Sequence, residues 1–148
     1  MLKTERCTTP EALDALVDLA LALWPGHSPS ELTRELSGLL NHPEAALFLA
    51  ERAGKAVGFA QCQLRRDYVE GATSSPVGYL EGIYVQPDYR RQGIARQLLA
   101  QCQGWAAEQG CREFASDCLL ENRDSFAFHL QTGFQEVGRL ICFVKPLP

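Results

Sequence analysis

The chain has 148 residues, of which 46% are hydrophobic and 22% charged, with a formal net charge of −4. This size and composition suit one folded domain, residues 1–148, and exclude a disordered or fibrous protein. A negative chain without a basic stripe argues against binding to nucleic acid. No apolar run reaches the roughly 18 residues of a membrane span. Neither nucleic acid nor a membrane is therefore an expected partner.

The six cysteines form no CxxC pair, and none lies at zinc-ligand spacing from a histidine. Each falls within an apolar strand or helix pattern, which is typical of small buried hydrophobic residues in a reducing compartment. The first six residues alternate in charge and contain no hydrophobic signal core. We therefore expect a cytoplasmic protein without a metal site.

Hydrophobic periodicity and turn residues predict an alternation of strands and helices. The first half of the chain is expected to form a strand at 2–7, a helix capped by Thr9 and running to Trp24, a helix opened by the capping box Ser28–Glu31, and strands at 46–51 and 56–64 joined by a hairpin turn at 52–55. The second half is expected to form a polar loop at 67–76, a strand at 79–85, a helix at 93–109, a strand at 114–116, a helix from Asn122 to Gly133 and two strands within 134–146. This order predicts an α/β protein of the α+β type, with a mixed central sheet and helices on both faces.

The segment around Gly93 is the most informative part of the sequence. A buried strand ends at Gln86-Pro87, a basic turn follows, and Gly93 opens an amphipathic helix. The first helical turn has N–H groups without intrahelical partners, and the helix dipole adds about half a positive charge there. Arg90 and Arg91 add formal positive charge. The pattern predicts an anion site, with a plain strand–turn–helix as the alternative.

Arg90 to Ala95 fits the form [QR]-x-x-G-x-[GA], and through this motif the chain resembles the GNAT acyltransferases. Asn122 followed by His129-Leu130-Gln131-Thr132-Gly133-Phe134 is similar to that family's late motif. The resemblance implies a sheet splayed by a bulge and acetyl-CoA as cosubstrate, held through backbone N–H groups of the turn. The implied cosubstrate-binding residues are Ile83, Tyr84, Val85, Arg90, Arg91, Gln92, Gly93, Ile94, Ala95, Arg96 and Asn122.

His129 departs from the family pattern, which has a tyrosine at this position to protonate the CoA thiolate. A histidine has an unperturbed pKa of about 6.5 and could do the same work. It could equally be a packed residue without a chemical role, and both interpretations stay open.

Several further segments resemble one subgroup of the GNAT family, the aminoglycoside 6'-N-acetyltransferases. They are Leu23–His27, Arg66–Gly71, Ser74–Pro76, Leu80–Ile83 and Cys111–Asp117. The resemblance implies direct transfer of acetyl from acetyl-CoA to the 6'-amine of a polycationic antibiotic in a ternary complex, which confers resistance. It also implies a homodimer, for which the C-terminal strands are plausible contact elements.

Glu81 is the leading candidate for the general base because it interrupts a buried apolar strand, where an unpaired carboxylate is costly. Trp24 continues an apolar helix stripe, so core packing and drug binding both remain open for it. Glu70, Glu121 and Glu136 are more typical of a solvated surface. The expected catalytic residues are Glu81, Asp117 and His129, and the expected substrate-binding residues are Trp24, His27, Tyr68, Glu81, Asp117 and Glu136.

Two other functions fit the same motifs. The chain could be a GNAT enzyme for another amine, such as a protein N-terminus, a lysine or a polyamine. It could also be a non-catalytic acyl-CoA sensor that keeps the anion-binding turn and lacks groups that activate an amine.

Overall fold

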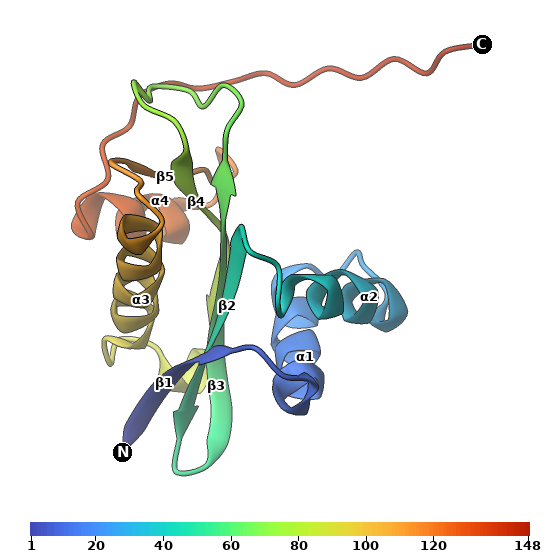
Figure 1. The fold of residues 1–148 in the computed structure, drawn as a ribbon, viewed down its shortest axis with the longest axis vertical. Helices are drawn as coiled ribbons and strands as arrows, with labels where there is room; N and C mark the ends of the chain where they lie inside the picture. The colour runs from blue at the N-terminus through green and yellow to red at the C-terminus, as the bar shows by residue number, and fades with distance from the viewer.

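Five strands form one sheet in the order β1-β2-β3-β4-β5 in the computed structural model, which describes residues 1–148 (Figure 1). Neighbours from β1 to β4 are antiparallel, whereas β4 and β5 are parallel. The sheet is therefore mixed, and β5 is its last strand on one side. The strands are β1 (Leu2–Cys7), β2 (Ala45–Arg52), β3 (Lys55–Arg65), β4 (Val77–Val85) and β5 (Phe114–Ser116).

The helices cover both faces of this sheet (Figure 1). One pair, α1 (Leu13–Leu23) and α2 (Pro29–Leu39), lies on one face, and α3 (Ile94–Glu108) lies on the other with α4 (Arg123–Gln131) beside it. No helix combines the length and apolar character that crossing a bilayer requires. The predicted fold class, a mixed sheet with helices on both faces, is confirmed.

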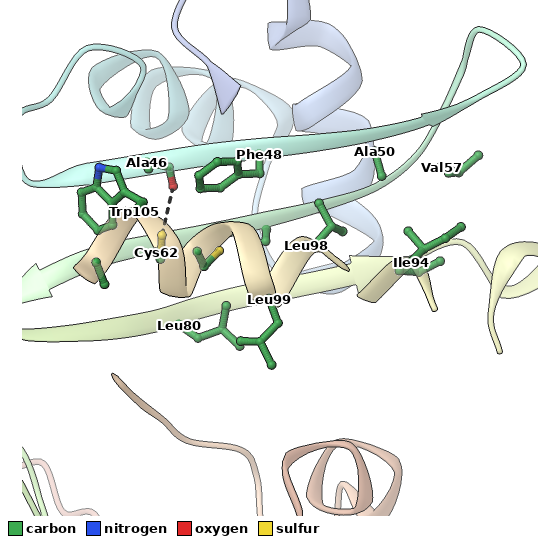
Figure 2. Packing of buried hydrophobic residues seen from close by; sticks show 14 residues of the cluster. Ala46, Phe48, Ala50, Val57, Cys62, Leu80, Ile94, Leu98, Leu99 and Trp105 are labelled. Carbon is green, nitrogen blue, oxygen red and sulfur yellow. Dashed lines mark hydrogen bonds between the residues drawn. The ribbon is translucent and has the colours of Figure 1, made fainter. Parts of the chain in front are cut away.

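The packing of α3 fixes where its first turn lies. Figure 2 shows the side chains of Ile94, Leu98, Leu99 and Trp105 between the helix and the strands, and each is at most 4% exposed. Full burial of one such side chain contributes about 1.5–3 kcal/mol. The start of α3 is therefore held firmly at the end of β4. A second core joins α1 and α2 to the opposite face through Leu16, Leu32, Leu36, Leu47 and Phe59.

Local sequence signals predicted two helix caps and one hairpin turn, and two of these three features are present. The Ser28 Oγ accepts a hydrogen bond from the Glu31 N–H at 3.2 Å, as the capping box predicts. The Glu31 carboxylate accepts from the Ser28 Oγ at 3.1 Å, in place of the reciprocal bond to the Ser28 N–H. Ala53 and Gly54, both at positive φ, form the β2–β3 turn. The expected Thr9 cap was wrong, because Pro10–Ala12 form a separate 3-10 turn and the Thr9 side chain makes no cap bond.

The two strands expected within 134–146 are not formed, and this prediction was wrong. No helix or strand follows α4, and the chain runs away from the sheet as an extended segment (Figure 1). Its apolar side chains are open to solvent, with Leu140 73% and Val144 96% exposed. A strand needs a hydrogen-bonded neighbour, and the segment lies beside none within this chain. We call residues 135–148 the C-terminal segment.

Candidate active site

The turn before α3 offers unpartnered backbone N–H groups. Gly93, the N-cap residue of α3, has φ +81°, a left-handed conformation that glycine adopts without strain. No side chain caps this helix, so the first amides keep no partner from the chain. A Cβ added at Gly93 would meet no atom within 4 Å. The predicted anion site is therefore open to solvent and can be approached closely by a ligand.

The two arginines of the turn have different surroundings. The Arg90 Nε donates to the Val85 carbonyl at 2.8 Å, and its guanidinium lies 5.4 Å from the Tyr84 ring centre. Arg90 thereby ties the turn to the end of β4. Arg91 is exposed and adopts φ +62°, and no hydrogen bond or ion pair engages its side chain. Both guanidinium groups keep their positive charge, and the whole side chain of Arg91 is free to meet an anion.

A bulge in β4 opens the sheet beside this turn. Gln61 pairs with Gly82 and Cys62 with Leu80, so Glu81 has no partner on β3. The β4–β5 pairing also ends at Leu80–Ser116. β5 ends at that pair, whereas β4 continues to Val85 without a strand on this side, and we call the space along this open edge of β4 the β4–β5 gap. The expected splayed sheet is thus present, with Glu81 as the extra residue of the bulge.

The alternation of β4 turns two N–H groups toward the gap. The Gln86 N–H donates to the Val57 carbonyl at 2.8 Å, on the β3 side. In an antiparallel pair the N–H groups of successive residues point alternately to the two neighbours. Tyr84 therefore faces β3, whereas the N–H groups of Ile83 and Val85 face the gap. These are the two main-chain positions expected to meet an extended ligand.

Glu81 is held in a two-point ion pair that sequence reasoning missed. The Arg65 Nε donates to one carboxylate oxygen at 3.1 Å, and its Nη2 donates to the other at 2.8 Å. The Glu81 side chain is 16% exposed, so a partner cation is needed to hold its charge there. Arg65 gave no signal in the sequence because it ends a strand next to Arg66, and only the sheet register sets it beside the bulge.

Tyr79 links this pair to Asp117. The Arg65 guanidinium carbon lies 3.4 Å from the Tyr79 ring centre, and the Tyr79 hydroxyl donates to the Asp117 carboxylate. Burial, followed by the hydrogen bond to Asp117, raises the pKa of Tyr79 well above its usual range. The phenol therefore stays a donor, and the two predicted carboxylates share one network. We call Glu81, Arg65, Tyr79 and Asp117 the acidic cluster.

Trp24 occupies the wall beside the acidic cluster. A Cβ added at Gly82 would lie 2.5 Å from its indole ring, so the ring covers the backbone next to Glu81. It also packs edge-on against Phe59 at 6.0 Å and His27 at 6.4 Å between ring centres. Trp24 is half-buried, which allows it to serve both the core and the site.

Two expected substrate-binding residues lie apart from the acidic cluster. Tyr68 is 82% exposed and donates to Glu70 at 2.9 Å. Glu136 pairs with Arg139 at 3.0 Å at the start of the C-terminal segment. No hydrogen bond or ion pair connects either residue to Glu81 or Asp117. Within one chain, the structure does not bring them to the cluster.

His129 is linked through Ser116 to the apex of the gap, the point at which the β4–β5 pairing ends. Its Nδ1 lies 2.7 Å from the Ser125 carbonyl, and its Nε2 lies 2.8 Å from the Ser116 Oγ. A carbonyl oxygen only accepts, so Nδ1 carries a proton, and in the neutral ring Nε2 accepts from Ser116. Ser116 was not among the predicted residues. Asn122 caps α4 by accepting from the Ser125 N–H at 3.1 Å.

Comparison with known proteins gives the class to which this site belongs. Residues 13–134 match the Acetyltransferase (GNAT) family. An aminoglycoside N(6')-acetyltransferase type 1 from Stenotrophomonas maltophilia is 46% identical over 145 residues, which are 97% of this chain and 94% of the relative. One from Serratia marcescens is 46% identical over 136 residues, or 91% and 93% of the two chains.

Solved structures agree with this assignment. Aminoglycoside N-acetyltransferase AAC(6')-Iy in complex with CoA superposes with a TM-score of 0.96 at 38% identity, covering 99% of this chain and 96% of that one. The same enzyme with a bisubstrate analog, CoA-S-monomethyl-acetylneamine, gives a TM-score of 0.95, with 99% of each chain covered. The chain belongs to the acetyltransferase (GNAT) family. The predictions of an N-acetyltransferase and of acetyl-CoA as cosubstrate are confirmed.

Proposed function

We propose that this chain, acting as one domain over residues 1–148, transfers acetyl from acetyl-CoA to the 6'-amine of aminoglycoside antibiotics and so confers resistance. One observation carries the proposal: Glu81 and Asp117 lie where the β4–β5 gap begins, and the uncapped turn before α3 follows Val85 at its other end. Carboxylates attract a polycationic acceptor, and helix amides attract a diphosphate. The similarity to aminoglycoside N(6')-acetyltransferases supports the same acceptor.

The residues around the turn fit acetyl-CoA. Uncapped amides at the start of α3 suit its pyrophosphate, and Gly93 leaves room for close approach. The Ile83 and Val85 N–H groups suit the amide-bearing arm between the phosphates and the thioester. When bound, the cosubstrate supplies an activated acetyl group. The Val85 N–H would stabilise the negative charge that develops on the acetyl oxygen, and such donors contribute about 3–4 kcal/mol.

Glu81 is the proposed proton acceptor for the attacking amine. It stands at the bulge, next to the N–H groups that line the gap. An ammonium group must lose a proton before it can attack, and a positioned carboxylate can take that proton directly or through one water molecule. Asp117 would hold a second ammonium group of the drug, because its carboxylate is exposed apart from its bond to Tyr79.

Either Asp117 or His129 is the proposed source of the proton that the departing sulfur takes up. His129 is half-buried at the apex of the gap and bonded to Ser116. With both ring nitrogens protonated, it would donate from Nε2 to the Ser116 Oγ while the Ser116 hydroxyl gives its proton to sulfur. A free thiol has a pKa of about 8.5, so this step needs only modest help.

Trp24 and His27 are the proposed apolar and aromatic wall for the sugar rings. Their contact beside Gly82 leaves the indole half-exposed next to Glu81. Aromatic rings also attract ammonium groups, with about 0.5–2 kcal/mol per contact. Tyr68 and Glu136 remain proposed drug contacts, through movement of their loops toward the gap.

We further propose a cytoplasmic homodimer. Cytoplasmic location agrees with six free cysteines. For the dimer, the support is the C-terminal segment, whose Ile141, Phe143 and Val144 are 82–96% exposed, together with the unpaired outer edge of β5. Such an edge is a template for another chain. Sedimentation of the full chain should give a dimer, and a chain ending at Gly138 should give a monomer. A monomeric full chain would refute this part.

The test of the proposed function is release of CoA thiol from acetyl-CoA in the presence of a kanamycin-type drug with a 6'-amine. The matched control is the analogue with a 6'-hydroxyl. We expect release with the amine only. Release with peptides or polyamines and with no 6'-amino drug would assign another acceptor. Tight CoA binding with no release for any amine would indicate a sensor.

A further inference from the structure

The acidic cluster contains its own cation. Both Glu81 oxygens are occupied by Arg65, at 2.8 and 3.1 Å. The Arg65 guanidinium also stacks on Tyr79, whose hydroxyl binds Asp117. A guanidinium therefore lies where the carboxylates would otherwise receive an ammonium group. Arg65 is the only cation in contact with Glu81, so it neutralises the Glu81 charge when no drug is bound.

A drug ammonium and Arg65 would compete for the same carboxylate oxygens. The Arg65 side chain is 40% exposed, so its guanidinium can swing into solvent when it is released. The two-point contact uses one lone pair of each Glu81 oxygen. An ammonium group at the remaining lone pairs would lie beside the guanidinium charge, so like-charge repulsion weakens its binding while Arg65 is in place. If Glu81 is free of Arg65 for only a fraction of the time, the apparent dissociation constant of the drug is its intrinsic value divided by that fraction.

We propose that Arg65 is a resident counter-ion which the acceptor's ammonium group displaces from Glu81, and that it thereby sets the affinity and charge selectivity of the acceptor site. This inference rests on the proposed function, because it takes the acceptor to be an aminoglycoside. Arg65 is a specificity-determining residue in this scheme. It admits ligands with enough positive charge to replace a guanidinium and excludes neutral sugars and weakly charged amines.

The chain provides a matched control in the neighbouring residue. Arg66 makes the same kind of pair with Glu44, with its Nη2 at 2.9 Å and its Nε at 3.1 Å from one carboxylate oxygen. That pair is more exposed, with side chains 58% and 38% accessible, and it lies outside the acidic cluster. Arg66→Gln therefore removes a similar ion pair without opening the proposed acceptor site.

The experiment measures the dissociation constants of neamine and of CoA by calorimetry for the wild type, Arg65→Gln, Arg65→Lys and Arg66→Gln. If Arg65 occupies Glu81 for about 90% of the time, Arg65→Gln should bind neamine about tenfold more tightly. Arg65→Lys should fall between it and the wild type, and Arg66→Gln should match the wild type. CoA affinity should be unchanged throughout, which also reports correct folding.

A second comparison isolates the competition. In the Glu81→Gln variant, Arg65 and the drug have no carboxylate at position 81 for which to compete. Adding Arg65→Gln to this variant should therefore leave neamine affinity unchanged. Weaker or unaltered neamine binding by Arg65→Gln in a protein that still binds CoA would overturn the inference and leave the proposed function standing. Absence of neamine binding by the wild type and by Arg65→Gln would refute both. If Arg65→Gln does not fold, an affinity of Arg65→Lys equal to that of the wild type is the overturning result.

Discussion

The turn before α3 and the acidic cluster both border β4, yet they are built in different ways. The turn uses backbone N–H groups of consecutive residues, and its form depends on one left-handed glycine, Gly93. The acidic cluster uses side chains of β3, β4 and the residue after β5, which only the sheet brings together. A backbone site depends on conformation, whereas a side-chain site depends on residue identity and register. The two should therefore respond to different substitutions.

The largest expected effect is on the acidic cluster. Glu81→Gln keeps the size of the side chain and removes its basicity, and it should lower kcat/KM for a 6'-amino drug by about 10²–10⁴-fold, the usual contribution of a general base. The dissociation constant of CoA should stay within twofold of the wild type, since the turn is untouched. Steady-state kinetics and calorimetry measure the two. Wild-type kcat/KM would remove Glu81 as the base.

The turn should be most sensitive at Gly93. A non-glycine residue there has a left-handed backbone, which costs about 1–2 kcal/mol, and Gly93→Val adds a stiff branched side chain. CoA affinity should fall about tenfold, because 1.4 kcal/mol corresponds to a factor of ten.

Gly104→Ala is the control for Gly93→Val. Gly104 lies inside α3 with no atom within 4 Å of an added Cβ. This change should stabilise the protein by about 0.5–1 kcal/mol and leave CoA binding unchanged. Equal CoA affinities for Gly93→Val and the wild type would show that the turn does not depend on its glycine.

Substitution of Ser116 tests whether its hydrogen bond to His129 contributes to catalysis. Ser116→Ala removes the hydrogen bond to the His129 Nε2 at 2.8 Å. The rate constant kcat should fall about two- to twelvefold, the equivalent of one net hydrogen bond of about 0.5–1.5 kcal/mol. Ser116→Thr, which keeps the hydroxyl, should recover most of it. Saturating single-turnover assays measure the change. An unchanged kcat in Ser116→Ala would favour a packing role for His129.

The smallest effect concerns thiol reactivity beside the acidic cluster. Cys118 is exposed directly after Asp117, whereas burial and then the charges of Glu5 and Glu51 raise the pKa of Cys7 to about 11. At pH 8 only about one Cys7 in a thousand is a thiolate, so iodoacetamide should spare Cys7 and alkylate Cys118. Bound drug should shield Cys118 and slow its alkylation relative to that of Cys142, which is also exposed. Peptide mapping gives the rates. Equal rates with and without drug would separate Cys118 from the acceptor site.

Much of the fold followed from local patterns. The helices, the hairpin at Ala53-Gly54 and the Ser28 cap were predicted correctly, since periodicity and turn chemistry act over a few residues. The bulge in the strand containing Glu81 was expected only from the family resemblance. Boundaries shifted slightly, as at Thr9, where a separate 3-10 turn precedes α1. The C-terminal strands failed because strand formation depends on a partner, which the pattern of a segment does not specify.

The sequence by itself determined the class of chemistry: a strand, a basic turn and a glycine-capped helix for an anion, with a carboxylate in the adjoining apolar strand. Local conformation depends on residues that are consecutive in the chain, so these features could be predicted from the sequence. Tertiary structure alone decided that Arg65 faces Glu81, that Tyr79 joins Asp117 to the same network, and that Ser116 meets His129. These contacts join residues from different elements, and their geometry arises only when register and packing set the strands side by side.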